Sequence, residues 1–138
     1  MRLLLDTCVI IDMLVDKDSM DEAALRYLED YNNIRFASME SMRELVVHFN
    51  NKNLLSKRWK TSYEVIDYVE NVLNILFLPI SRDVILKYST LQLNTSQNHR
   101  DPSDHIIISH AIVEHLTLMT SDEKFSFYCD QGLDLIEY

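Results

Sequence analysis

Residues 1–12 read MRLLLDTCVIID, and this opening stretch determines which fold we expect. Its apolar run Leu3–Leu5 is short, unbroken and ends at Asp6, a pattern typical of a buried parallel strand. A helical pattern begins at Thr7, so Asp6 stands where a strand gives way to a helix. Asp is a favoured helix N-cap, and a carboxylate at a strand end can also bind a ligand. Both roles stay open for Asp6.

The alternation of strand and helix continues to the end of the chain. Further apolar runs predict strands at Ile34–Ala37, Ile75–Leu78, Leu116–Met119 and Leu133–Ile136. Helical spacing predicts helices at Thr7–Val15, Asp21–Asp30, Ser38–Asn50, Tyr63–Leu73 and Asp83–Leu93, and another that opens at Asp101-Pro102. This order predicts an α/β fold in which roughly four to five parallel strands lie between helices on both faces.

The expected fold also predicts where a ligand binds. In open parallel sheets, ligands sit beyond the carboxyl ends of the strands, where the strand order switches. Asp6 and Asp122 lie just past the ends of the first and fourth predicted strands. We therefore expect both carboxylates to reach the same crevice.

The size and composition of the chain indicate its class. It has 138 residues, of which 47% are hydrophobic and 25% charged, values that predict one globular domain over residues 1–138. We see no membrane span and no secretory signal, and so expect a cytoplasmic protein without a membrane partner. Cys8 and Cys129 lack metal-type spacing, which favours buried, reduced thiols.

Charge and glycine content exclude several function classes. The formal net charge is -9, which argues against strong nucleic-acid binding through the overall field. It does not exclude a nuclease, because a metal ion held by acids supplies positive charge to the phosphate. Gly132 is the only glycine, whereas P-loops and dinucleotide fingerprints each need several. Kinase, NTPase and Rossmann-cofactor functions are therefore excluded.

The predicted chemistry depends on four acids: Asp6, Glu44, Asp104 and Asp122. Phosphodiester hydrolysis requires charge neutralisation, a positioned water and a stabilised leaving oxygen, which bound Mg²⁺ or Mn²⁺ can supply. Such hard cations prefer oxygen ligands, and this sequence offers carboxylates rather than paired Cys and His. We predict that the four acids hold Mg²⁺, with Mn²⁺ as the alternative, and that Thr7, Asp101 and Thr120 support them.

Most of these acids also have a structural interpretation. Asp122 could cap a short helix over Lys124–Tyr128. Asp101 at the N-cap, Pro102 at the first helical position and Asp104 at the third come close to a capping box. This arrangement accounts well for Asp101. Asp104 also lies where the helix dipole favours an anion, but it could face the crevice.

Glu44 lies inside a predicted helix, so capping does not explain it. Glu40, Glu44 and His48 are spaced four apart and could form a solvated flank of that helix. Glu40 is the competing metal ligand, although its place in the first helical turn gives it a structural reason. The alternatives for Glu44 are therefore a metal ligand and a solvated side chain.

Two other groups of residues were considered as binding sites. His105, His110 and His115 are spaced five apart, so they do not share a helix face as zinc ligands would, and exposed positions are predicted. Between Leu45 and Tyr63 there is no acid. This basic window contains Lys57, Arg58, Trp59 and Lys60, which predict either a solvated surface or a contact with RNA or a partner.

The order of these motifs resembles the PIN-domain family. Leu3–Thr7 resembles the first motif, a strand ending in Asp followed by Thr or Ser. Ser38–Leu45 resembles the second, with a helix-borne Glu before Leu. His99–Asp104 resembles a stretch of many VapC-like toxins, in which the later Asp is the metal ligand. Leu118–Phe125 resembles the final motif, whose Asp, here Asp122, completes the pocket.

This resemblance implies a three-layer α/β/α fold, Mg²⁺ or Mn²⁺ dependence and an RNA substrate. For the toxin branch it also implies a homodimer inhibited by a small antitoxin. We therefore predict a metal-dependent endoribonuclease that is the toxin of a toxin–antitoxin pair. The common motif has an aromatic residue where Ser103 stands and an Arg where His105 stands. All four acids are present in spite of these departures. What is missing is the Arg itself, which would form a salt link or contact RNA.

Three alternatives follow from the same residues. A phosphatase of the haloacid-dehalogenase type needs a second Asp two positions after the first, where this chain has Cys8. A PIN-domain nuclease of RNA processing, outside toxin–antitoxin systems, would share every motif. A non-catalytic PIN-like binding module would predict a broken set of acids, yet all four are present.

Overall fold

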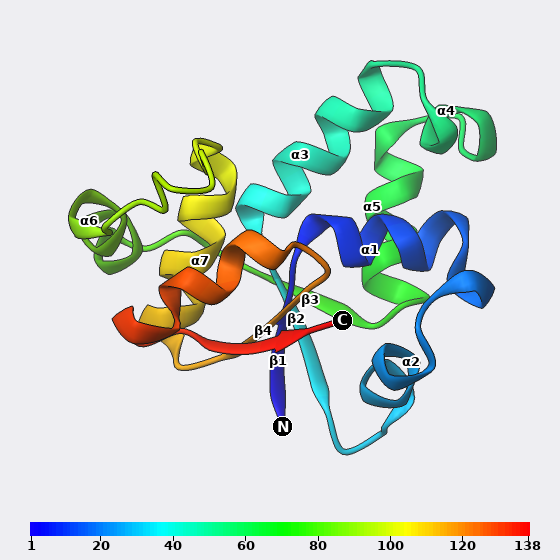
Figure 1. Ribbon diagram of the computed structural model, residues 1–138. Helices are drawn as coiled ribbons and strands as arrows, with labels where there is room; N and C mark the ends of the chain where they lie inside the picture. Colours follow the sequence, from blue (N-terminus) through cyan, green and yellow to red (C-terminus); the bar gives the residue numbers. More distant parts are fainter.

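The computed structural model describes residues 1–138, whose strands form one parallel sheet in the order β3-β2-β1-β4-β5. The strands are β1 (Arg2–Leu5), β2 (Ile34–Ser38), β3 (Ile75–Leu78), β4 (Thr117–Thr120) and β5 (Asp134–Glu137). The chain adds β2 and β3 on one side of the central β1 and then crosses to β4 and β5 on the other (Figure 1). Every strand predicted from the sequence is confirmed, with ends that shift by no more than about a residue.

Helices connect the strands. They are α1 (Thr7–Val15), α2 (Glu22–Glu29), α3 (Met39–Asn50), α4 (Leu54–Arg58), α5 (Ser62–Asn71), α6 (Arg82–Thr90) and α7 (Pro102–Glu114), with 3₁₀ segments η1 (Lys17–Ser19) and η2 (Glu123–Gln131). The sequence did not predict α4 or η1. The short helix α4 begins where the Asn53 side chain accepts the N–H of Leu55, and Leu55 is fully buried. Its formation therefore depends on tertiary packing more than on periodicity.

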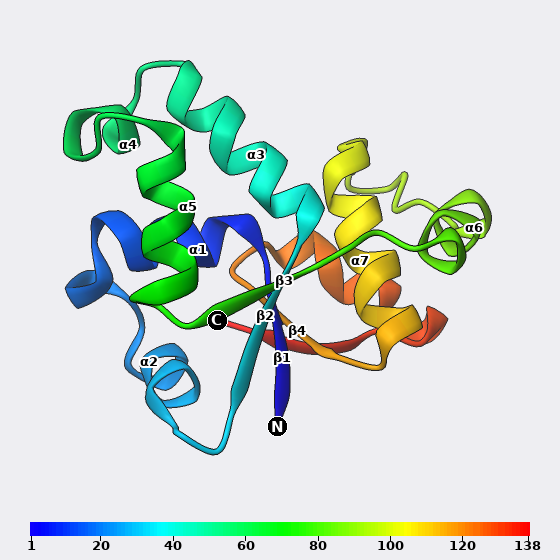
Figure 2. The ribbon, with the colours of Figure 1, turned by 180° about the vertical axis from the view of Figure 1, so that it is seen from behind.

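The sheet separates two apolar cores, which confirms the three-layer α/β/α fold. Leu3 and Leu5 face one core, in which α1, α2, α4 and α5 pack, whereas Leu4 faces the other, with α7 and η2. The two sets of helices lie on opposite sides of the sheet in Figures 1 and 2. Both faces of β1 are buried, which explains why its sequence is uniformly apolar rather than alternating.

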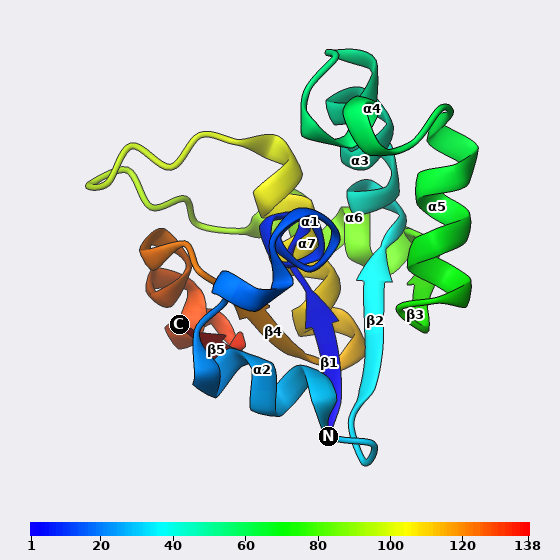
Figure 3. The same ribbon diagram turned by 90° about the vertical axis from the view of Figure 1, so that its right-hand side faces the viewer.

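Helix α3 begins directly after β2 and contacts helices from both faces of the sheet. It contacts α5 on one side and α7 on the other, and Figure 3 shows the arrowheads of β1 and β2 pointing towards the region where α1 and α3 begin. Ser38 caps α3 by accepting the N–H of Glu40, as the sequence predicted. The carboxyl ends of the strands thus meet the amino ends of several helices.

Two further properties of the fold bear on the expectations from sequence. None of its helices has the length and apolar character needed to cross a bilayer. Cys8 and Cys129 are both free thiols, as predicted. The expected burial is wrong for Cys129, which is exposed, while Cys8 is half-buried. Cys129 lies in η2 away from the core positions Phe125 and Tyr128 of that segment.

The packing of the sheet predicts that truncating a leucine of the central strand β1 destabilises the fold more than truncating a leucine of the edge strand β3. Leu5 is 0% exposed in the centre of the sheet, whereas Leu76 on the edge strand β3 is 56% exposed. Leu5→Ala should therefore lower the free energy of unfolding by about 3 kcal/mol through lost burial and a cavity. Leu76→Ala should cost less than about 1 kcal/mol. Urea unfolding of both variants measures the difference, and equal losses would contradict this packing.

Candidate metal-binding site

Asp6 lies directly after β1 and caps α1, so the two roles left open by the sequence coincide. Its Oδ1 accepts the backbone N–H of Thr7 at 2.8 Å, and its Oδ2 accepts the hydroxyl of Thr120 at 2.7 Å. The Cys8 thiol lies 3.3 Å from the same Oδ2. Only 5% of Asp6 is exposed. Burial raises the pKa of Asp6 above its ordinary value, because the charged form loses its hydration.

Thr120 connects Asp6 to Asp122. Its buried hydroxyl donates to Asp6 and accepts the backbone N–H of Asp122 at 3.1 Å. Asp122 accepts the N–H of Lys124 at 2.9 Å, so it caps η2, as the structural interpretation predicted. The backbone N–H of Asp6 also donates to Met119 O at 3.0 Å. These bonds fix both acids at the carboxyl ends of the neighbouring strands β1 and β4, where the strand order switches.

Thr7 makes a similar connection between Asp6 and Glu44. Its Oγ1 lies 2.6 Å from Glu44 Oε1 and 2.9 Å from Ser41 Oγ. A carboxylate can only accept, so the Thr7 hydroxyl donates to Glu44. Burial raises the pKa of Glu44, and the charges of Asp6 and Asp101 raise it further. Glu44 is therefore a half-buried member of the acid group and not part of a solvated flank.

Asp104 reaches the same place from the first turn of α7 and is held by His99. The ring Nε2 of His99 lies 2.9 Å from Asp104 Oδ2, and its Nδ1 lies 3.1 Å from the hydroxyl of Tyr128. The Tyr128 hydroxyl also accepts the backbone N–H of Asn94 at 3.1 Å. Burial lowers the pKa of His99, which favours a neutral ring.

These bonds define the hydrogen positions once Asp104 is ionised, as a metal ligand must be. Asp104 Oδ2 can then only accept, so Nε2 of the neutral His99 ring carries the hydrogen. Nδ1 becomes the acceptor and Tyr128 donates to it. His99 and Tyr128 are thus positioning residues that the sequence analysis missed. His99 could have been noticed because it begins the stretch His99–Asp104, whereas no sequence pattern pointed to Tyr128.

The charges of the other three predicted acids act on Asp104. Carboxylate and ring atoms of His99, Asp104 and Asp122 lie within 4.8 Å of one another, a close group that does not include Asp6 or Glu44. Burial raises the pKa of Asp104 to about 8. Neighbouring negative charges add to that rise, namely those of Asp6, Asp101, Glu44 and Asp122. Like charges this close disfavour ionisation unless a cation lies among them.

The group fits a hard divalent cation. Of the four acids, only Asp104 contacts a basic side chain, and that side chain is the neutral ring of His99. No Lys or Arg neutralises the set, and the free donor atoms are carboxylate oxygens, which Mg²⁺ and Mn²⁺ prefer. Asp6, Glu44, Asp104 and Asp122 are therefore the residues that could hold the ion.

The other acids considered from the sequence have structural roles. Asp101 is exposed and caps α7 by accepting the N–H of Ser103 at 2.9 Å, as predicted. Glu40, the competing ligand, is 7% exposed and binds Arg43 and Ser103 instead of the acid group. An Arg thus satisfies Glu40, whereas Glu44 receives only a neutral hydroxyl.

The exposure predicted for the α7 histidines is wrong in two of three cases. His105 is 3% exposed and stacks edge-on against His99, with ring centroids 4.8 Å apart. His110 is 0% exposed and its Nδ1 lies 3.0 Å from Ser38 Oγ. Only His115 is exposed. Helix α7 is covered on more than one side, so residues on several of its faces are buried.

The basic window lies away from the acids. Arg58 donates to Leu14 O at 3.0 Å, near the C-terminal end of α1, whereas Asp6 caps the opposite end of that helix. Trp59 packs on Tyr68 with ring centroids 5.4 Å apart and joins the core. Lys57 and Lys60 are exposed. Arg58 and Trp59 therefore have structural reasons for their positions, and the two lysines remain available for a partner.

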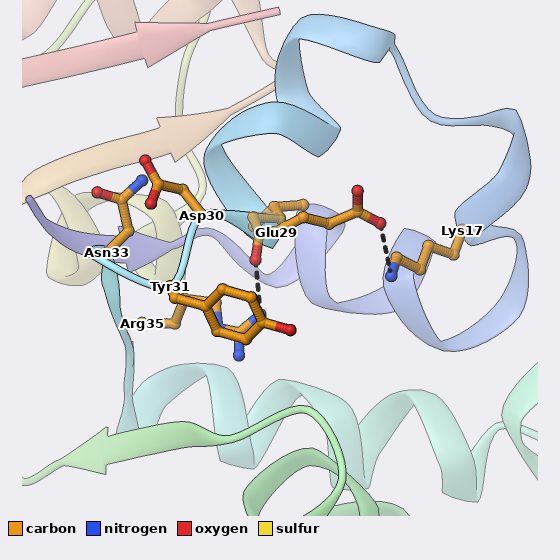
Figure 4. A pocket seen from close by; sticks show the side chains of 7 residues that line it. Lys17, Glu29, Asp30, Tyr31, Asn33 and Arg35 are labelled. Carbon is orange, nitrogen blue, oxygen red and sulfur yellow. Dashed lines mark hydrogen bonds and ion pairs between the residues drawn. The ribbon is translucent and has the colours of Figure 1, made fainter.

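The larger hollows of the surface are also distant from the acid group. One of about 550 Å³ lies at the amino end of β2, between Lys17, Tyr31 and Arg35. Figure 4 shows Lys17 paired with Glu29 across it, at 3.1 Å, and Arg35 bound to the backbone. Both basic side chains of this hollow thus already have partners within the chain. Proximity of the carboxylates, and not the size of a cavity, identifies the candidate site.

Comparison with known proteins gives the family. The profile of the PIN domain matches residues 3–130. This chain belongs to the PIN-domain family. The matched range includes all four acids of this PIN domain and the residues that hold them, from Asp6 to Tyr128. A search of curated proteins finds no match.

Solved structures resemble this PIN domain over its whole length. VapBC2 from Rickettsia felis bound to a DNA fragment from its promoter has a TM-score of 0.74 at 20% identity, covering 99% of this chain and 98% of that chain. VapBC-1 from nontypeable Haemophilus influenzae gives 0.71 at 18%, covering 99% and 98%. VapBC-5 from Mycobacterium tuberculosis, of a toxin–antitoxin family, gives 0.66 at 20%, also covering 99% and 98%. At such identities the likeness shows a shared fold.

The acid group predicts a pH-dependent stability for the metal-free PIN domain. The pKa of Asp104 is 3.8 ordinarily and about 8 in the fold, so between these values the folded state binds the extra proton. Stability in EDTA should therefore fall as pH rises through this window. Asp104→Asn should flatten the fall and be more stable than wild type at the upper end by about 1 kcal/mol. Urea unfolding across the pH range measures both.

A matched control and a metal titration sharpen this experiment. Asp83 occupies the first turn of α6 but is exposed, so Asp83→Asn should keep the wild-type pH profile. Mn²⁺ should raise the melting temperature of wild type and of Asp83→Asn, because it binds the folded state preferentially. It should raise that of Asp104→Asn much less. An equal shift in all three proteins would show that Asp104 is not a ligand.

Proposed function

We propose that this PIN domain is a Mg²⁺- or Mn²⁺-dependent endoribonuclease and the toxin of a toxin–antitoxin pair. The observation that supports the nuclease is the convergence of carboxylates from four parts of the chain without a basic partner. Asp6 and Asp122 follow β1 and β4, Glu44 lies on α3, and Asp104 begins α7. The proposal treats residues 1–138 as one PIN domain.

The chain's own residues would bind and orient the reacting groups. When bound, the metal ion would neutralise phosphate charge and make a water molecule more nucleophilic. Asp6, Glu44, Asp104 and Asp122 would hold the ion. Thr7, Thr120 and His99 would keep three of these carboxylates in place by hydrogen bonds. Preorganisation of this kind matters because ligand groups that shift by even about 1 Å can lose most of their catalytic effect.

The solved structures support the toxin part of the proposal. VapBC-5 is described as a member of the VapBC family of toxin–antitoxin systems, and a similar structure from Klebsiella pneumoniae is described as a toxin–antitoxin complex. By analogy, we propose a small antitoxin as the partner of this chain and a homodimer as its assembly. The exposed lysines Lys57 and Lys60 are candidates for the antitoxin contact, because neither forms an ion pair within the chain.

Metal-dependent cleavage of RNA is the direct test of the nuclease. Wild type should cut RNA in Mg²⁺ or Mn²⁺ and lose this activity in EDTA. Asp6→Asn should lose at least about 100-fold of the rate, because the metal then lacks a ligand. The control Asp83→Asn should cut normally. Full activity in EDTA would refute the metal mechanism, and hydrolysis of a phosphomonoester without RNA cleavage would favour a phosphatase.

Growth of cells that express the protein tests the toxin. Wild type should stop growth, Asp104→Asn should not, and co-expression of the small protein encoded next to it should restore growth. Lys57→Glu with Lys60→Glu should keep RNA cleavage but weaken this rescue if the window binds the antitoxin. RNA cleavage without any effect on growth would instead indicate a nuclease of RNA processing.

A further inference from the structure

Arg43 precedes Glu44 on α3 and is held in one orientation by two buried side chains. Its Nε and Nη2 donate to Glu40 Oε1 at 2.9 and 2.6 Å, and Nη2 also donates to Ser103 Oγ at 2.8 Å. Ser103 in turn donates to Glu40 Oε1 at 2.7 Å. Glu40 and Ser103 are each 7% exposed. The three side chains thus form a closed ring whose buried part fixes the guanidinium.

The guanidinium remains accessible from outside. The Arg43 side chain is 58% exposed, and its Nη1 makes no hydrogen bond within the chain. Arg43 and Glu44 line the same shallow hollow of about 240 Å³, together with Val47, His48 and Asn51. A ligand in this hollow would therefore lie beside Arg43 and Glu44, although Asp6, Asp104 and Asp122 do not line it.

The ring also places Arg43 relative to the acids. Ser103 comes just before Asp104 on α7, as Arg43 comes just before Glu44 on α3, so the bond between them joins the two helices that carry these acids. Glu40, and then Glu44 and Asp101, raise the pKa of Arg43, which shows that the charges of the site act on it. Arg43 is thus a fixed positive charge at the edge of the acid group.

RNA carries one negative charge per nucleotide, so its binding beside the acid group requires a positive charge such as that of Arg43. The formal net charge of -9 repels RNA as a whole, so attraction must come from local cations and bound metal. A guanidinium offers a planar fork of donors that matches phosphate oxygens, and it is always charged. In Arg43 one edge of that fork is used by Glu40 and Ser103, while Nη1 stays free.

We propose that Arg43 binds a backbone phosphate of the RNA beside the acid group, and that Glu40 and Ser103 position it for this contact. This inference rests on the proposed ribonuclease function. The competing account is that Arg43 only neutralises the buried Glu40. The two accounts differ in whether Arg43 affects RNA binding or stability alone.

The test measures binding of a labelled single-stranded RNA in EDTA at several salt concentrations, and the KM for its cleavage in Mn²⁺. Arg43→Gln should weaken binding about tenfold, as loss of a charged hydrogen bond does. It should also reduce the slope of log K against log salt by about 0.7, the value for one phosphate of a single strand. KM should rise while the Mn²⁺ affinity, measured by calorimetry, does not fall, because removal of a nearby positive charge does not weaken the binding of a cation.

Two further variants serve as controls. Arg26 pairs with Glu22 on α2 at 2.9 Å and is 77% exposed, so Arg26→Gln removes a similar ion pair at a distance and should leave KM and the salt slope unchanged. Arg43→Lys keeps the charge and the pairing with Glu40 but loses the planar fork. It should keep the salt slope and show a smaller rise in KM.

The outcomes separate the proposals. If wild type cleaves RNA while Arg43→Gln keeps its KM and salt slope and loses only stability, Arg43 merely neutralises Glu40 and the inference is wrong. If Arg43→Gln does not fold, a wild-type KM for Arg43→Lys overturns it equally. If wild type neither binds nor cleaves RNA, the proposed function fails and the inference fails with it.

Discussion

The site depends on the repulsion among carboxylates that the fold brings together at the carboxyl ends of β1 and β4. Asp6 is almost fully buried, and Asp104 lies close enough to the other acids for burial and their charges to raise its pKa to about 8. Two threonine hydroxyls partly satisfy this cluster, since Thr120 donates to Asp6 and Thr7 to Glu44. A hydroxyl orients a carboxylate without removing its charge. The acid group therefore stays available to a cation, at a cost to the stability of the metal-free fold.

The carboxylate of Glu40 is neutralised by an arginine, unlike those of Asp6 and Glu44, which receive threonine hydroxyls. Glu40 lies one helical turn from Glu44, yet it receives an Arg and a Ser and is closed to metal. Asp104 receives His99, whose neutral ring can hold it in place but does not cancel its charge. Two acids of one helix thus differ because Glu40 contacts Ser103 of α7 and Arg43, whereas Glu44 contacts Thr7 of α1. Glu40 thus links α3 to α7, whereas Glu44 has no cationic partner and is left for the proposed metal site.

Ser103 and His105 show how departures from the common motif are accommodated. Ser103 is small enough to bond both Glu40 and Arg43, which an aromatic side chain there could not do. His105 is buried against His99 and does not extend to the surface as an arginine would. The chain therefore lacks a cation at position 105 but holds Arg43 near the same acids. The positive charge at the edge of the site comes from α3 instead of α7.

The sequence alone determined the α/β order, the strands and the capping roles of Ser38 and Asp101, because hydrophobic period and N-cap preference are local properties. It also placed Asp6 and Asp122 at one edge, since parallel strands end on the same side of a sheet. Only the tertiary structure showed that Glu40 is paired with Arg43 while Glu44 is not, that His99 and His105 are buried, and that Trp59 packs against the core. The two glutamates depend on residues far away in the chain, Glu40 on Ser103 and Glu44 on Thr7. Local patterns carry no information about such partners.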